Sequence, residues 1–178
     1  MDMEAEWKAI SEKQAALNSV LLKDDDLGVI VRAHIYIETE LDEFIRARLD
    51  QPEALKSLKL DFDGRANLAV GLGLDKGLKA LISSIGSLRN DFAHNLRGEI
   101  GRQEANNLRK AMKPPYIDAC RVAYKKTLDK LQSTDKPKSI NDLPPKDQVI
   151  LYLVNAWGAM ASAALQARQA KAVRSSAT

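Results

Sequence analysis

The chain has 178 residues, 45% of them hydrophobic and 29% charged, with a net charge of +3 at pH 7. This length fits one domain with a substantial core. The single cysteine, Cys120, excludes an internal disulfide, and one Cys with two His excludes a Cys/His zinc site. We expect no metal ion and no cofactor. The opening MDMEAEWKAI lacks the basic and apolar parts of a secretory signal, so we expect a cytoplasmic protein.

The charge is distributed unevenly along the chain. Residues 1–96 carry a net charge of −5, residues 97–138 of +6, and residues 139–178 of +2. A basic region can attract a polyanion and hold its phosphates. The alternative is that the charges belong to ordinary solvated helix faces, and the counts alone do not decide between the two.

Apolar residues recur at a spacing near 3.6 in every long segment, which predicts helices throughout. In the first segment, Trp7, Leu17 and Leu21 are among the candidate core residues. We find no β alternation and therefore predict an all-α bundle. The predicted long helices span residues 4–22, 26–49, 75–94, 101–113, 114–131 and about 145–173. Between the second and the third of these, we predict a short helical turn that begins at Pro52 and a helix that runs from Asp61 or Asp63 to Gly71.

The predicted organisation is a helical bundle over residues 1–131, a linker over 132–144, and a C-terminal helix over 145–178 that packs on the bundle or on a dimer. Residues 149–165 contain no charge. The length of this uncharged stretch is at the lower limit for a helix that crosses a bilayer of about 30 Å. Polar and small side chains make this segment weakly hydrophobic. We therefore predict a buried helix and no membrane partner.

Two histidines attract attention for different reasons. His34 lies on the apolar stripe of its helix, with Glu38 four residues later, and this favours a core or interface histidine bonded to a carboxylate over a catalytic one. The stretch SLRNDFAHN places Arg89 at an apolar-stripe position and His94 near the helix end. A guanidinium at such a position needs a carboxylate, a second subunit or a solvated cleft.

Arg89 and His94 do not share a face of an ideal helix. Five residues at ~100° each turn their side chains about 140° apart. They can still converge if the helix frays near His94. They can also converge if two such helices meet about a two-fold axis, where Arg89 of one copy approaches His94 of the other.

The string Arg-Asn-Asp-Phe-Ala-His at residues 89–94 resembles the Arg-polar-x-x-x-His signature of HEPN domains. Its lead-in, residues 62–94, is similar to the mannitol operon repressor-like branch of that family in its helix, GLGL turn, helix and RNxFAH ending. The helix predicted at residues 35–49 fits the same layout. The resemblance covers roughly residues 15–130, so the C-terminal helix is additional to it.

The resemblance implies a HEPN-like bundle that dimerises, so that two motifs face a shared cleft. Active members of the family cut RNA without a metal. Carried to this sequence, His94 is the general acid or base, Arg89 binds the scissile phosphate, and Asn90 orients one of these groups. Asp91 is expected to point away or to pair with Arg89.

The resemblance leaves three functions open. The first is a metal-independent endoribonuclease of a toxin or phage-defence type, with RNA, a second copy of the chain, and an antitoxin or other regulatory protein as partners. The second is a non-catalytic regulator of the mannitol operon repressor-like type. The third is a nucleotide-binding module of the same family.

Overall fold

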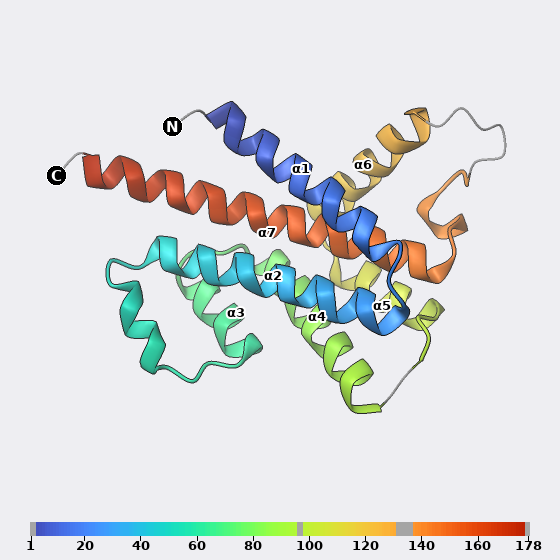
Figure 1. Ribbon diagram of the computed structural model, residues 1–178, viewed down its shortest axis with the longest axis horizontal. Coiled ribbons are helices and arrows are strands. Elements are labelled where there is room, and N and C mark those ends of the chain that lie inside the picture. Colours follow the sequence, from blue (N-terminus) through green and yellow to red (C-terminus); the bar gives the residue numbers. More distant parts are fainter. Residues whose placement is uncertain (1–2, 96–97, 131–136, 177–178) are drawn as a thin grey trace.

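The computed structural model describes residues 3–95, 98–130 and 137–176, and within these ranges the chain folds entirely into helices and loops (Figure 1). The all-α prediction is confirmed. The helices, in chain order, are α1 (Met3–Leu21), α2 (Asp26–Arg48), η1 (Pro52–Ser57), α3 (Phe62–Gly71), α4 (Lys76–Asn95), α5 (Arg102–Ala111), α6 (Tyr116–Lys130), η2 (Ile140–Asp142) and α7 (Pro145–Ser176).

Aspartates fix where three of these helices begin. The Asp25 carboxylate accepts a hydrogen bond from the Gly28 amide at 2.7 Å, and Asp61 accepts one from the Gly64 amide at 2.8 Å. Asp75 accepts from the Leu78 amide at 3.2 Å. Each bond satisfies a backbone donor that has no partner within the first helical turn. The structure thus selects Asp61 rather than Asp63 as the cap of α3, and Asp25 among three consecutive aspartates as the cap of α2.

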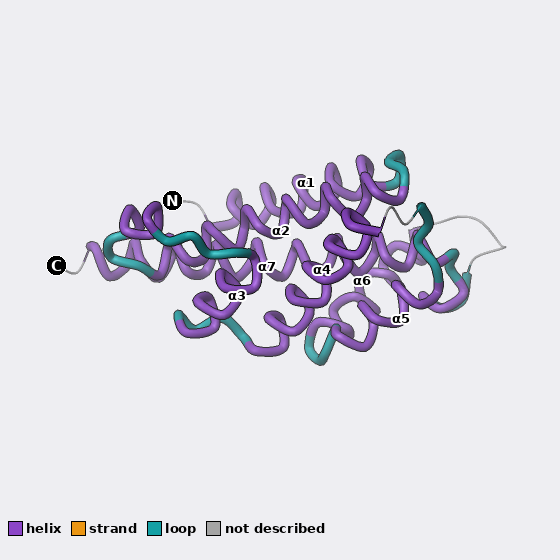
Figure 2. Tube along the Cα trace, turned by 90° about the horizontal axis from the view of Figure 1, so that it is seen from below, coloured by secondary structure: helices purple, strands orange, loops and turns teal. Residues whose placement is uncertain are grey.

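Helix α7 runs through the middle of the molecule. It packs against α1, α2, α4, α5 and α6. In Figure 2, α1 lies along one edge and α3 and α5 lie toward the opposite edge, with α7 between them, and both termini lie at the same end. The Trp157 and Tyr152 side chains of α7 are each 1% exposed, which confirms the prediction of a buried helix.

Helix α7 is long and apolar enough to cross a membrane by length and composition alone. No other helix in the described part of the chain meets this criterion. However, 61% of its apolar window is buried inside the chain, and the core helix of a soluble protein meets the same criterion. Its apolar side chains are therefore accounted for by packing against the chain's own helices.

Helix α1 departs from the predicted core pattern. Leu17 and Leu21 are buried, but Trp7 is 39% exposed. The reason is geometric, because α1 contacts α7 and α2 from the outside of the bundle, so that only part of its apolar surface is covered. Of the predicted linker, residues 132–136 lie outside the described residues, and the part after them includes η2, whose Ile140 is buried.

Candidate functional site

The last two turns of α4 carry the motif residues on the surface. Arg89, Asn90, Asp91 and His94 are all exposed. The expectation that Arg89 occupies the buried stripe was wrong, because Leu88 takes that position; the buried residues of this helix face are Leu78, Leu81, Ile82, Ile85, Leu88 and Phe92. The Arg89 guanidinium instead reaches solvent, where it can meet an anion without a burial penalty.

Arg89 and Asn90 line a pocket of about 500 Å³ between α2, the start of α3, and α4. The Arg89 Nη1 donates a hydrogen bond to the Asn90 Oδ1 at 3.1 Å, which holds the two side chains together. The remaining lining residues are His34, Glu38, Asp61, Phe62, Asp63, Ser83, Gly86 and Ser87.

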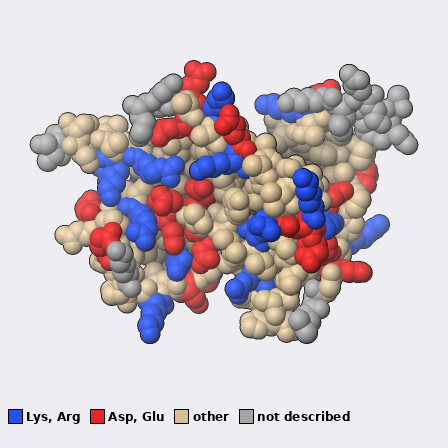
Figure 3. Space-filling view, viewed as in Figure 1, with Lys and Arg blue, Asp and Glu red and all other residues tan. Residues whose placement is uncertain are grey.

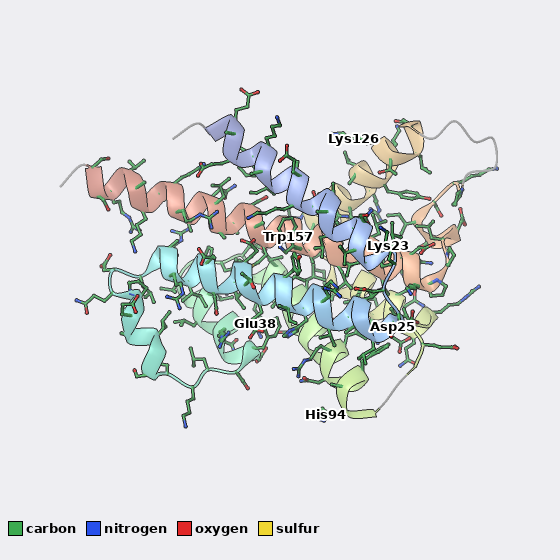
Figure 4. All side chains as sticks on the ribbon, in the orientation of Figure 1. Lys23, Asp25, Glu38, His94, Lys126 and Trp157 are labelled. Atoms are coloured by element: carbon green, nitrogen blue, oxygen red, sulfur yellow. The ribbon has the colours of Figure 1, made fainter. Side chains whose placement is uncertain are left out.

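His94 does not line this pocket. It lies at the end of α4, well separated from Glu38 in the view of Figure 4. One copy of the chain therefore brings Arg89 and Asn90 together at the pocket but not His94. His94 lies one turn beyond Asn90, near the end of α4, and about 140° around the helix from Arg89.

His34 lines the same pocket as Arg89 and Asn90, which the sequence did not indicate. Its side chain is 6% exposed, and its ring centroid lies 4.2 Å from that of Phe62. Its Nδ1 is 3.8 Å from the Glu38 Oε2, which is too long for a hydrogen bond. The prediction of a core histidine is thus confirmed, but its predicted hydrogen bond to a carboxylate was wrong.

The pKa of His34 lies below its ordinary value. Burial is the main cause, because it disfavours the charged imidazolium; the Glu38 carboxylate opposes this effect and the Arg89 guanidinium adds to it. His34 and Arg89 line the same pocket, which is why the guanidinium acts on the imidazole. His34 is therefore neutral at pH 7 and can accept or donate a hydrogen bond there.

The pocket also contains three carboxylates, and each has a structural partner. Glu38 pairs with Arg65 at 2.9 Å, and Asp61 caps α3. Asp63 accepts a hydrogen bond from the Ser83 hydroxyl at 2.7 Å, which lowers its pKa. By contrast, Arg89 forms no ion pair with any described residue, Asp91 included, and is the cation available to an incoming anion.

Other kinds of chemistry find less support in the described residues. No group of three His, Cys, Asp or Glu side chains gathers there in a way that could hold a metal ion. Cys120 is fully buried, as predicted, and burial raises the pKa of its thiol to about 12. A thiol that stays protonated at pH 7 is a poor nucleophile.

No protein-family model, curated protein or solved structure matches this chain. The fold class is therefore established by the helices themselves. The HEPN-like assignment stays a prediction that rests on the motif and its lead-in.

Proposed function

We propose that this chain is a metal-independent endoribonuclease of the HEPN type that acts as a homodimer through Arg89, Asn90 and His94. The observation that carries the proposal is the exposure of all three side chains on the last two turns of α4, with Arg89 forming no ion pair among the described residues. A surface guanidinium and a surface imidazole supply phosphate binding and proton transfer.

The reaction is a transesterification within the RNA strand. The imidazole of one His94 accepts the proton of the ribose 2′-hydroxyl, and the 2′-oxygen attacks the adjacent phosphorus. The bond from phosphorus to the 5′-oxygen breaks, and that oxygen takes up a proton from water. Arg89 stabilises the charge that builds up on the phosphoryl oxygens. The products are a 2′,3′-cyclic phosphate and a 5′-hydroxyl, and DNA is not cut because it lacks the attacking group.

A second copy of the chain completes the site. Arg89 and His94 diverge on their own helix, so a two-fold pairing is the arrangement that brings one of each together. Helix α2, which packs against α4, offers a surface for this pairing. Its Leu27 is 44% exposed and its Ile35 54% exposed, two helical turns apart, with the partly buried Val31 between them. Exposed apolar stripes of this kind mark protein interfaces.

Mixing two inactive variants tests the shared site directly. Arg89→Ala and His94→Ala should each abolish RNA cleavage in EDTA. When the two variants are mixed and allowed to exchange subunits, the solution should recover about one quarter of the wild-type rate. Half of the dimers then contain one copy of each variant, and each of these dimers has one intact site. No cleavage by the wild-type chain, or no recovery in a mixture that size-exclusion chromatography shows to be dimeric, would contradict the proposal.

A non-catalytic regulator of the mannitol operon repressor-like type is the second candidate. The observation that favours it is the set of carboxylates beside Arg89, from Glu38, Asp61 and Asp63, which repel phosphate. In this case Arg89 belongs to an interface, and Arg89→Ala weakens dimerisation. Growth separates the two candidates, since equal growth of cells that express the wild type and His94→Ala favours the regulator.

A further inference from the structure

A second polar hollow lies apart from the Arg89 pocket, on the part of the chain that carries the excess of positive charge. It consists of two adjoining pockets of about 820 and 510 Å³ that share Arg109 and Asn141. Its walls are α5, α6 and residues 138–148, and Tyr152 of α7 closes one side. We call it the basic groove. No residue that lines the basic groove also lines the pocket beside Arg89.

Five cations line the basic groove against two carboxylates, Asp129 and Asp142; the cations are Arg102, Arg109, Arg121, Lys125 and Lys138, and all are exposed. Arg121 forms an ion pair with Asp118 at 2.9 Å, which is an exposed and therefore weak pair. The other four cations form no ion pair with any described residue. Asp142 is occupied in capping η2, where it accepts hydrogen bonds from the Ser139 amide and hydroxyl.

Helical spacing explains why the cations gather there. On α5, Arg102 and Arg109 lie two turns apart on one face. On α6, Arg121 and Lys125 lie one turn apart, on the face whose apolar residues Ile117, Tyr124 and Leu128 form the floor of the groove. The cations therefore surround an apolar strip.

Hydrogen bonds fix the walls of the basic groove in place. The Tyr124 hydroxyl donates to the Pro137 carbonyl at 3.1 Å, which ties α6 to the segment before η2. The Gln148 Nε2 donates to the Leu143 carbonyl at 2.8 Å, which ties that segment to the start of α7. The groove is thus preformed, and a ligand that binds there does not have to order it.

We propose that the basic groove binds the phosphodiester backbone of a single-stranded nucleic acid. Exposed cations that have no ion-pair partner in the described part of the chain bind successive phosphates, and an apolar floor receives the faces of unpaired bases. A duplex presents its phosphates but hides its base faces, so it cannot use the floor. The choice of RNA as the physiological strand rests on the proposed ribonuclease function, whereas the binding itself does not depend on His94.

The chain offers closely matched variants for a test. Arg109→Gln with Lys125→Gln removes two cations of the groove. Lys110→Gln with Lys126→Gln removes two charges from the next positions on the same helices, where the exposed side chains point about 100° away. Figure 4 shows Lys126 on α6. Both pairs change the net charge equally, and circular dichroism and thermal unfolding check that both remain folded.

Binding is measured in the His94→Ala background by fluorescence anisotropy, with labelled strands of about 12 nucleotides. The groove pair should weaken RNA binding about tenfold at physiological salt and flatten its salt dependence, because two phosphate contacts are lost. The control pair should change the affinity less than twofold. Single-stranded DNA of the same sequence should bind comparably, because the backbone supplies the contacts.

The proposal for the basic groove would be overturned by no binding of either strand, by equal weakening by the two pairs, or by binding that is lost on Arg89→Ala but kept by the groove pair. Strong preference for duplex would also contradict it. None of these results decides the proposed function, which depends on whether the wild-type chain cleaves RNA. Conversely, a chain that binds RNA through the groove but never cleaves it would support the groove and refute the ribonuclease.

Discussion

The two histidines of this chain lie in opposite environments. His34 is enclosed between α2, α3 and α4, with Phe62 against its ring and Arg89 across a pocket. His94 is exposed at the end of α4. A histidine that must meet a large polymer has to be accessible, whereas a buried neutral histidine can orient neighbours or fill space. Under the proposed function, His94 is therefore the candidate for proton transfer, whereas the burial of His34 fits a structural role.

The same contrast extends to the surface charge. On the face shown in Figure 3, blue and red side chains are interspersed over the half that contains α3 and the C-terminal part of α2. There, Glu38 and Asp42 both pair with Arg65, at 2.9 and 3.1 Å. In the basic groove, four of the five cations have no such partner among the described residues. The exposed cations of the basic groove are therefore available to a ligand, whereas Arg32 on α2 and Arg65 on α3 pair with nearby acids.

The largest effect is expected from removing His94. His94→Ala should reduce RNA cleavage by about 10²- to 10⁴-fold, because general acid–base catalysis is lost. The free energy of unfolding should change by less than about 0.5 kcal/mol, since the side chain is exposed. Gel assays of labelled RNA and urea titrations measure the two quantities. If His34→Ala abolishes cleavage in a folded chain while His94→Ala does not, the roles of the two histidines are reversed.

A smaller effect is expected where α3 packs on α4 beside His34. A Cβ at Gly86 would lie 2.8 Å from the Phe62 Cδ1, so Gly86→Ala must push the ring that rests on His34. We expect a loss of about 1–3 kcal/mol in the free energy of unfolding.

Gly71→Ala is the matched control for this prediction, because no atom lies within 4 Å of a Cβ added there. It should stabilise the chain slightly, by about 0.4–1 kcal/mol, through a less flexible unfolded state. Denaturant unfolding compares the two variants. Equal stability of Gly86→Ala and the wild type would show that Phe62 can move without disturbing the pocket.

The pH dependence of stability sharpens the contrast further. The pKa of His34 is lowered in the folded chain, so the unfolded chain binds a proton more readily. The free energy of unfolding should therefore fall as the pH drops from about 7 through about 6.5 and below. Glu38 and Arg89 are the charged groups that face His34. His34→Gln should flatten this part of the profile, and an unchanged profile would contradict the burial of a neutral imidazole.

The smallest effect concerns the interaction between Arg89 and His34, which line the same pocket. Arg89→Gln removes one of the causes that lower the pKa of His34, so that pKa should rise slightly, as measured by NMR titration. Arg102→Gln, which lines the separate basic groove, should leave it unchanged. Equal responses to both substitutions would mean that Arg89 does not act on His34 across the pocket.

The sequence by itself determined the helices. The 3.6-residue spacing and the caps at Asp25, Asp61 and Asp75 are local features, and the structure has these helices close to where they were predicted. It also placed His94 near the end of the helix that begins after Asp75, where α4 ends. These predictions succeed because each depends on neighbours within a few residues along the chain.

Only the tertiary structure decided which helix faces meet. It exposed Trp7, placed α7 at the centre of the bundle, and put Arg89 beside His34 rather than His94. It also joined α5 and α6 to residues 138–148, which makes one groove from separate stretches of the chain. Periodicity identifies the apolar face of a helix but not the element that covers it, because that choice depends on how all the helices pack together.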